Sequence, residues 1–508
     1  MDRRNTAPGI AAFVAAVLVA LIGLGASADS PADPATRPQG TVNLRLLGVN
    51  DLHGHLEPPR PGLGGAAWLD AHLDRATIPG RTIRVHAGDM VGASPLVSSW
   101  FHDEPAIEAA NAMGFDVGTV GNHEFDEGGD ELLRLLRGGQ RAGAGSLKRD
   151  ADGSVVNTSS AEFGGAAFPY VGANTYDRDG ELVLPPFQIV ERAGARIGFI
   201  GVTTESTSRF LLPRHSERFR FTDISEAVDR WVPELQRRGV EAIVVLAHSG
   251  AHGDAGDATS AEGEIVGEAA EMSAAVDVVI AGHSHSLLNL RIPNRDGPGD
   301  KLVVEALSYG IAYDRVDIAV DRATGHVVEK SADVPSTAHR GIEQDPATAA
   351  LVARHVDRVA PLADRVVGTA AAPSTRANGR LGELAAAAQL AFAEADVAVV
   401  NGGSLRADLD AGRLAYAELF AVHPYDFDLL RLKLSGRALT RLLEGPDSSQ
   451  LYLAGADGPF DPHKTYTVVA NELIATGSMF PALRDGARRR EVVGTEVEAL
   501  VRHVERNG

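Results

Sequence analysis

Short apolar runs recur along residues 41 to about 325, and each run ends in a cluster of polar residues. Runs of this kind that are rich in Val and Ile are typical of buried strands. Between them, apolar positions take a helical spacing, as in Glu104–Met113 and Ile224–Arg238. Strands that alternate with helices predict an α/β layer structure. The predicted strands are Leu44–Val49, Ile83–Val85, Val117–Val120, Ile197–Val202, Ile243–Ala247 and Val276–Ala281.

A second α/β unit is expected after a helical connector. Residues 326–344 are polar and are expected to be irregular, and Pro346–Val366 has the pattern of an amphipathic helix. Beyond that helix the chain has strand-like runs of its own at Val397–Val400 and Tyr466–Ala470. The predicted division is an N-terminal domain over residues 41–335, a linker with the helix over 336–366 and a smaller C-terminal domain over 367–508.

The first 28 residues have the order of a secretory signal peptide. Two arginines precede an apolar run over Ile10–Leu24, and Ala26–Ala28 supplies small residues for cleavage. The run is short for a membrane span of ~20 residues, although its retention as an anchor is the alternative. We therefore expect cleavage near Ala28, a flexible leader over residues 29–40, and a secreted or cell-envelope (periplasmic) protein without a permanent membrane anchor.

The charge balance and the lack of cysteine exclude several classes of protein. Lys and Arg number 48 against 68 Asp and Glu, which gives a net charge of −20. A stable nucleic-acid partner is not expected, because phosphate backbones need a basic surface, but bound cations could still attract an anionic substrate. The chain has no cysteine, which excludes disulfides, thiolate zinc sites, iron–sulfur clusters and thiol nucleophiles.

Histidine, carboxylate and amide side chains follow the predicted strands. In open α/β sheets, ligands bind beyond the carboxyl ends of the strands, where these residues fall. Imidazole, carboxylate and amide oxygen are ligands of borderline divalent metals such as Zn, Mn, Co or Fe. The candidate metal ligands are Asp51, His53, Asp89, Asn122, His248, His283 and His285.

Seven ligands suffice for two metal ions if the Asp89 carboxylate bridges them. Two metal ions ~3.5–4 Å apart clamp a phosphoryl group and generate hydroxide at neutral pH. The sequence therefore predicts two divalent ions, with Zn, Mn, Co and mixed occupancy all open. One ion would take Asp51, His53, Asp89 and His285, and the other Asp89, Asn122, His248 and His283.

His123 and Asp126 form a candidate catalytic pair. They stand three residues apart just after a predicted strand, where a helix could begin. The carboxylate can then orient the imidazole, and such a pair suits the stabilisation or protonation of a leaving alkoxide. The alternative for Asp126 is a helix cap, which is compatible with the catalytic role.

Five ordered motifs resemble those of the calcineurin-like metallophosphatases: NDLHGHLEP, HAGDM, GNHEFDEG, LAHSG and AGHSH. With Ala173–Thr175 and the later NGGSLRADL, the chain resembles the two-domain 5′-nucleotidase family, which includes UDP-sugar hydrolases, ecto-5′-nucleotidases and cyclic phosphodiesterase/3′-nucleotidases. The resemblance implies a four-layer αββα metallophosphatase domain with a dinuclear site. It also implies a linker helix on which a smaller α/β substrate-binding domain rotates.

The same resemblance implies substrate contacts in the C-terminal domain. Arg406 matches the family's phosphate- or substrate-contacting arginine, and Tyr425 stands where the family has one of two rings that sandwich the base. Leu473 stands at the second ring position, and Met479 replaces an Asp that would hold ribose hydroxyls. Base recognition is therefore expected to be altered. The implied substrate-binding residues are Arg376, Asn401, Gly403, Arg406, Tyr425 and Leu473.

These features together predict a secreted metal-dependent phosphoester hydrolase that acts on a small molecule, a 5′-nucleotidase or nucleotide phosphatase. A 2′,3′-cyclic nucleotide phosphodiesterase, a UDP-sugar hydrolase or another ester hydrolase of the same family is the alternative. A catalytically inactive nucleotide-binding protein is the further alternative. The sequence leaves the oligomeric state open.

Overall fold

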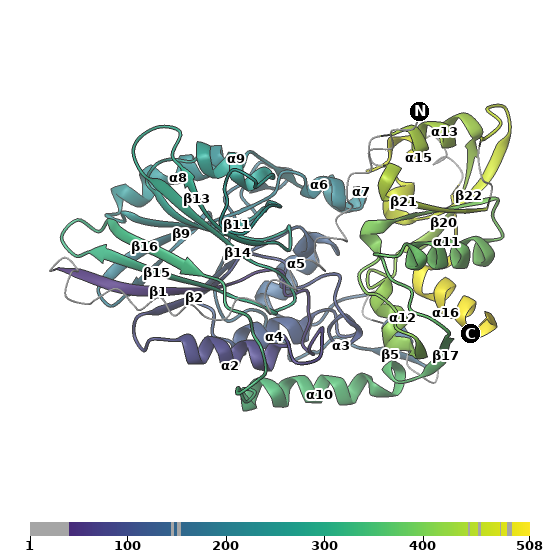
Figure 1. Ribbon diagram of the computed structural model, residues 1–508, viewed down its shortest axis with the longest axis horizontal. Coiled ribbons are helices and arrows are strands. Elements are labelled where there is room, and N and C mark those ends of the chain that lie inside the picture. Colours follow the sequence, from purple (N-terminus) through teal and green to yellow (C-terminus); the bar gives the residue numbers. More distant parts are fainter. Residues whose placement is uncertain are drawn as a thin grey trace.

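The computed structural model describes residues 40–143, 147–149, 154–445, 448–455, 459–477, 479–484 and 490–507. The predicted signal peptide and all but the last residue of the predicted leader lie outside the described residues. The described chain forms a larger N-terminal body and a smaller C-terminal body, and helix α10 (Pro346–Ala363) runs along both of them (Figure 1).

Two six-stranded sheets form the N-terminal domain. Strand β1 lies inside the first sheet, parallel to β2 and antiparallel to β15. The first sheet has the order β16 (Val327–Asp333), β15 (Asp314–Asp321), β1 (Thr41–Val49), β2 (Thr82–His86), β3 (Val117–Thr119), β6 (Tyr170–Val171). The second has the order β13 (Leu287–Pro293), β14 (Asp300–Ala306), β12 (Val276–Ala281), β11 (Ala242–His248), β9 (Ala195–Thr203), β8 (Phe187–Arg192).

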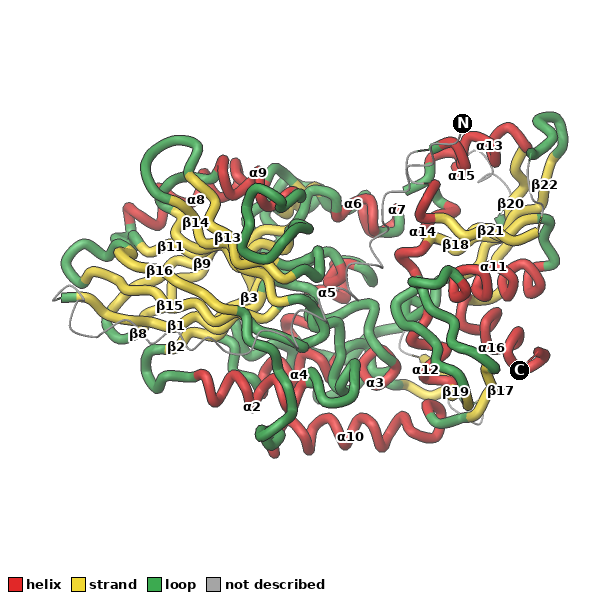
Figure 2. Tube along the Cα trace, viewed as in Figure 1, coloured by secondary structure: helices red, strands yellow, loops and turns green. Residues whose placement is uncertain are grey.

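The two sheets pack face to face, with helices on both outer faces (Figure 2). Alternate side chains of a strand point to opposite faces, so Leu44 and Leu46 of β1 enter the core between the sheets. Leu47 and Val49 instead pack on the helical side, against α2 (Ala66–Ala76). Helix α4 (Glu104–Ala112) shares that side, and α8 (Ile224–Arg237) and α9 (Glu264–Glu271) cover the second sheet. The predicted αββα architecture is confirmed.

The C-terminal domain contains one five-stranded sheet with helices on both faces. Ala398 and Val400 of β18 face the core that includes α11 and α16, whereas Val397 and Val399 face α13. The sheet has the order β21 (Leu451–Gly455), β18 (Val397–Asn401), β22 (Thr465–Asn471), β20 (Asp428–Ser435), β23 (Glu491–Thr495). The helices are α11 (Arg380–Ala393), α16 (Glu496–Asn507) and α13 (Gly436–Glu444).

Helix α10 joins the two domains and ends earlier than predicted. The Asp345 side chain accepts hydrogen bonds from two amides of its first turn, which fixes its start. It packs against α2 and α4, and His355 Nε2 lies 3.1 Å from Glu108 Oε2 of α4. The predicted helix over Pro346–Val366 was three residues too long, because Val366 begins strand β17 (Val366–Ala370), which pairs with β19 (Gly412–Ala415).

The prediction that residues 326–344 are irregular was wrong for their first part. Val327–Asp333 forms β16, the edge strand that pairs antiparallel with β15. Val327 and Ala332 pack on the core between the sheets, while most of the strand is exposed or half-buried. An edge strand of this kind buries few residues, so the apolar pattern that marks a central strand is absent.

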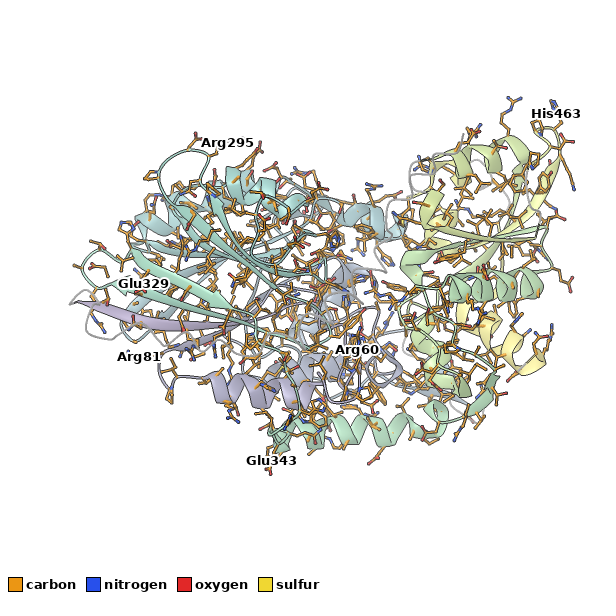
Figure 3. The ribbon with its side chains drawn as sticks, viewed as in Figure 1. Arg60, Arg81, Arg295, Glu329, Glu343 and His463 are labelled. Carbon is orange, nitrogen blue, oxygen red and sulfur yellow. The ribbon has the colours of Figure 1, made fainter. Side chains whose placement is uncertain are left out.

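The remaining elements are short, and several lie around the rim of the larger domain. Charged side chains such as Arg81, Arg295 and Glu329 extend outward from its periphery (Figure 3). Within the described ranges, no helix combines the length and apolarity needed to cross a bilayer. The short elements include α3 (Leu96–Ser99), η2 (His123–Phe125), α5 (Gly129–Arg137), β4 (Leu147–Arg149), β5 (Val155–Asn157), β7 (Thr175–Tyr176), α6 (Thr207–Phe210), α7 (Pro213–Ser216), β10 (Arg220–Phe221), α12 (Tyr416–Val422), α14 (Glu472–Ala475) and α15 (Pro481–Arg484).

Candidate active site

The predicted metal ligands lie where strands of both N-terminal sheets end. The first sheet contributes residues after β1, β2 and β3, and the second contributes residues at the ends of β11 and β12. Several ligands have left-handed backbone conformations, which cost energy in non-glycine residues and occur at functional sites. The left-handed ligands are Asp51 (φ 50°), His53 (49°), Asp89 (51°), His283 (76°) and His285 (55°).

Asp51, His53 and His285 form one half of the cluster. His53 Nδ1 lies 2.8 Å from Gly92 O, so Nδ1 carries the proton and Nε2 presents its lone pair. Burial lowers the pKa of His53 to about 4, which keeps the ring neutral. Its Nε2 lies 3.1 Å from His285 Nε2, and Asp51 Oδ1 lies 3.7 Å and 3.3 Å from these two atoms. Asp51 Oδ1 is buried without a hydrogen-bond partner in the described structure.

His248, Asn122 and His283 form the other half with Asp89. His248 Nδ1 donates to Ala87 O at 2.8 Å, and its Nε2 lies 2.9 Å from Asp89 Oδ2 and 3.2 Å from Asn122 Oδ1. Burial lowers the pKa of His248, but Asp89 outweighs burial and raises it to about 10. Ligand atoms of Asp89, His248 and His283 lie within 4.8 Å of one another.

The Asp89 carboxylate joins the two halves. Its Oδ2 lies 2.9 Å from His248 Nε2 and 3.8 Å from His53 Nε2, while its Oδ1 accepts a hydrogen bond from the His123 amide at 2.9 Å. A buried cluster of lone pairs and carboxylate oxygens is unfavourable unless a cation lies among them. The residues therefore fit divalent metal ions, and the structure brings all seven predicted ligands together.

Glu124 supports this cluster and was not singled out from the sequence. Its carboxylate accepts hydrogen bonds from the amides of Asp89 (3.0 Å), Met90 (2.9 Å) and Gly121 (2.6 Å). It thereby ties the loop after β2 to the loop after β3. Burial, with Asp89 adding to it, raises the pKa of Glu124 to about 7. Its place inside the GNHEFD motif was the available signal.

His123 and Asp126 are in contact, as their spacing predicts. His123 Nδ1 donates to Asp126 Oδ2 at 2.7 Å, which leaves Nε2 facing the C-terminal domain. Burial lowers the pKa of His123, but Asp126 and Asp89 outweigh it and shift the pKa upward. A protonated imidazole beside the ligand cluster can give a proton to a leaving oxygen.

Two residues of the C-terminal domain reach this cluster. Tyr425 Oη lies 3.5 Å from His123 Nε2, and the two rings stack at 5.6 Å. Arg406 has buried Nε and Nη2 atoms without a hydrogen-bond partner among the described residues. Burial lowers the pKa of Arg406, but Tyr309, Tyr425 and the carboxylates outweigh burial and raise it, so the side chain is a cation. A guanidinium with two buried, unpartnered nitrogens beside the ligand cluster is suited to bind an anion.

Other residues of the predicted substrate set lie elsewhere. Arg376 is exposed, and its Nε lies 3.2 Å from Asp408 Oδ1. Asn401 is buried and accepts a hydrogen bond from Asn471 at 3.3 Å, so its side chain joins the ends of β18 and β22. Gly403 is exposed, and a Cβ added there would meet the Asn401 side chain at 3.5 Å. Leu473 is only 8% exposed and offers little surface to a base.

The ring that pairs with Tyr425 is Phe427, which the sequence analysis did not single out. Their centroids lie 5.1 Å apart with an interplanar angle of 8°. Both rings follow α12 in the HPYDF segment, and Phe427 directly precedes β20. A second aromatic residue two positions after Tyr425 was visible in the sequence, but the close stacking depends on the turn at Asp426, which has φ 46°.

Tyr309 and His55 also border the cluster without having been predicted. Tyr309 has a left-handed backbone (φ 60°), and its amide donates to Asp51 O at 2.7 Å. Its ring lies 4.0 Å from that of His55, 5.8 Å from His53 and 5.4 Å from His285. A left-handed tyrosine is unusual. Nothing in the local sequence predicts it, because the conformation follows from contacts with distant residues.

The fold and this site define the class of protein, and comparison with known families agrees. Residues 44–287 match the calcineurin-like phosphoesterase family, and residues 359–457 match the 5′-nucleotidase C-terminal domain. The N-terminal domain is a calcineurin-like phosphoesterase domain, in a family of phosphoester hydrolases. With both domains in this order, the chain belongs to the two-domain 5′-nucleotidase family.

Three similar proteins illustrate the range of this family. The chain is 33% identical over 483 residues to endonuclease YhcR of Bacillus subtilis, covering 87% of this chain and 38% of that protein. It is 30% identical over 484 residues to cell wall protein Lmo0130 of Listeria monocytogenes, covering 84% of this chain and 59% of the relative. The chain thus spans less than two thirds of the length of each of these two relatives. The crystal structure of the 5′-nucleotidase precursor from Thermus thermophilus shares the fold, with TM-score 0.76, 22% identity, and 92% and 97% of the two chains covered.

Proposed function

We propose that this protein is a secreted phosphoester hydrolase that uses two divalent metal ions and acts on nucleotides. The observation that carries the proposal is the cluster of closely spaced ligand atoms, one of them a buried carboxylate oxygen without a partner, beside a guanidinium with two unpartnered nitrogens. His53 Nε2 and His285 Nε2 lie 3.1 Å apart, Asp51 Oδ1 has no partner in the described chain, and Arg406 lies close by. When bound, two ions would polarise the phosphoryl group and lower the pKa of the attacking water.

The metal ligands would divide into two sets that share Asp89. Asp51, His53 and His285 would hold one ion, and Asn122, His248 and His283 would hold the other. The shared Asp89 Oδ2 lies near an imidazole nitrogen of each set, at 3.8 Å from His53 and 2.9 Å from His248. Zn, Mn and Co all accept this combination of nitrogen and oxygen ligands, so the donor set alone does not select one of them.

The chain's own residues would bind the phosphate and handle the proton. Arg406 presents two buried N–H groups without partners and would donate them to phosphate oxygens. His123, oriented by the 2.7 Å contact with Asp126, would donate its Nε2 proton to the leaving oxygen. Tyr425 Oη, 3.5 Å from this nitrogen, stands where the leaving group would have to enter.

A nucleoside is the leaving group that the surrounding rings favour. The Tyr425 ring stacks on His123, and Phe427 lies near-parallel to Tyr425. Aromatic side chains bind bases by stacking, which contributes about 1–3 kcal/mol per base. Because Met479 stands where the family has an Asp, the pocket should discriminate poorly among sugars and bases. Broad specificity toward nucleoside monophosphates is therefore part of the proposal.

Secretion is supported by the signal-peptide pattern of residues 1–28. The Listeria relative is a cell wall protein by name, which agrees with action outside the cytoplasm. The absence of cysteine is also compatible with an oxidising compartment, since no thiol is exposed to it.

The proposal is tested by removing metal with EDTA and assaying phosphate release after adding Mn²⁺, Zn²⁺ or Co²⁺. The substrates are AMP, GMP, UMP, 2′,3′-cyclic AMP, UDP-glucose, nitrophenyl phosphate and single-stranded DNA. We expect metal-dependent turnover of the three monophosphates within about tenfold of one another, since one contact is worth near 1.4 kcal/mol. A marked preference for the cyclic nucleotide, UDP-glucose or DNA would overturn the nucleotidase proposal. Metal-independent turnover, or none, would overturn the metallophosphatase mechanism.

A further inference from the structure

A buried acid lies behind the turn that carries two of the proposed metal ligands. Glu305 is in β14, has no solvent exposure, and faces the residues between and after His283 and His285. Its two carboxyl oxygens lie 2.8 Å and 2.7 Å from the Ser284 hydroxyl, and Oε1 accepts a hydrogen bond from the Ser286 amide at 3.1 Å. Glu305 therefore contacts both residues that flank His285.

The number of protons available for hydrogen bonds at Ser284 indicates whether Glu305 is protonated or ionised. Ser284 Oγ also lies 2.8 Å from Ala251 O. A hydroxyl has one proton, whereas a backbone carbonyl and an ionised carboxylate can only accept. If Glu305 were ionised, one proton would have to serve both acceptors. If Glu305 is protonated, one carboxyl oxygen donates to Ser284 Oγ and Ser284 donates to Ala251 O, so both acceptors have a proton of their own.

The electrostatic surroundings point the same way. Burial raises the pKa of Glu305 well above its usual range, and Asp51 and Asp314 raise it further. Asp314 is itself fully buried, and neither of its carboxyl oxygens has a hydrogen-bond partner in the described structure. An additional negative charge at Glu305 would be buried among these carboxyl groups, which is costly.

We propose that Glu305 is a positioning residue that stays a neutral carboxylic acid and, through its proton, fixes the Ser284 turn that presents His283 and His285. The relevance to metal binding rests on the proposed metal centre, whereas the protonation state rests only on the hydrogen bonds. Groups that orient metal ligands from behind typically contribute 10–100-fold to metal affinity. Glu305 would have this effect without touching metal or substrate.

Two substitutions at Glu305, made in the whole chain, distinguish the role of its proton from the role of a negative charge. Glu305→Gln keeps a donor for Ser284 and an acceptor for the Ser286 amide, so the affinity for Zn²⁺, measured by chelator competition, should stay within about threefold of wild type. Glu305→Ala removes both contacts and should weaken at least one Zn²⁺ site by about 10–100-fold. If Glu305→Ala does not fold, Ser284→Ala replaces it in the test. This variant removes the acceptor of the Glu305 proton with little change in volume, and it should also weaken Zn²⁺ binding.

An infrared measurement tests the proton without using metal. The difference spectrum between metal-free wild type and Glu305→Gln should contain the C=O stretching band of one protonated carboxyl group. Absence of that band, or a Zn²⁺ affinity in Glu305→Gln as low as in Glu305→Ala, would overturn the inference. Failure of the wild type to bind Zn²⁺ would instead refute the proposed metal centre, and the infrared band would still decide the state of Glu305.

Discussion

The two sides of the candidate active site differ in how their side chains are held. We call the metal ligands of the N-terminal domain the N-terminal wall, and Arg406 and Tyr425 the C-terminal wall. On the N-terminal wall, the ligands follow strand ends, and backbone carbonyls at 2.8 Å orient the rings of His53 and His248. On the C-terminal wall, Arg406 and Tyr425 reach the site from loops of another domain, and the reactive groups lack firm partners there. The metal-ligand side chains of the N-terminal wall are therefore preorganised. The C-terminal wall depends on how the domains meet.

The largest effect is expected on the N-terminal wall, at the shared ligand. Asp89→Asn should lose most of its metal and reduce phosphate release by at least about 10³-fold, because metal ions contribute several kcal/mol of charge stabilisation. Metal content by mass spectrometry and turnover of AMP are the measurements. Asp317→Asn, at a half-buried carboxylate paired with Arg45 far from the metal ligands, is the matched control and should keep both. Two ions per chain and near-normal turnover in Asp89→Asn would contradict the shared-ligand model.

A second loss of turnover is expected on substitution of His123, which lies between the metal ligands and Tyr425. His123→Ala should retain its metal but lose about 10²–10⁴-fold in turnover of AMP, the usual contribution of general acid–base catalysis. The loss should be smaller for nitrophenyl phosphate, because nitrophenol leaves without protonation. Parallel assays of both substrates check this. Equal losses on both would show that His123 does not protonate the leaving group.

The C-terminal wall should respond through substrate binding. Arg406→Ala should lower kcat/KM for AMP about 10–100-fold without loss of metal, because hydrogen bonds to charged groups contribute about 1.5–3 kcal/mol. Arg376→Ala is the matched control, since Arg376 is exposed and paired with Asp408, and it should change kcat/KM less than about threefold. If Arg376→Ala has the larger effect, the assignment of the phosphate-binding arginine is reversed.

The smallest effect is expected where the domains touch at the rim. Arg214 of α7 and Glu472 of α14 form an ion pair across the two domains, and Arg214 is 57% exposed. Exposed ion pairs contribute about 0–1 kcal/mol and are screened by salt. Arg214→Ala should therefore change KM for AMP less than about fivefold, and the difference should disappear in high salt. A large, salt-independent change would mean that this contact controls domain closure.

Most of the architecture was predictable because buried strands and helices leave local patterns. Runs such as Ile243–Ala247 and Val276–Ala281 lie within single strands, β11 and β12. Edge strand β16 was missed, since its exposed residues carry no such pattern. The end of α10 was misplaced because pairing of Val366 with β19, a long-range contact, overrides the helical spacing.

The residues of the candidate site also fall into those that local sequence predicts and those that depend on distant contacts. Asp51, Asp89 and His283 were predictable because strand ends of adjacent sheets meet, and local sequence is enough to locate a strand end. Phe427 and Tyr309 were missed because their places depend on left-handed turns and distant contacts. Leu473 was assigned to the base pocket by sequence position, but burial of its side chain follows from packing that position does not reveal.

In the proposed metal centre, one cluster of side chains holds two metal ions that share Asp89. A crystal structure of the Mn²⁺-loaded protein, with anomalous scattering recorded at the Mn edge, tests it directly. We predict two anomalous peaks ~3.5–4 Å apart, with Asp89 Oδ2 bound to both, His53 at one ion and His248 at the other. A single peak, or two ions without Asp89 between them, would contradict the account.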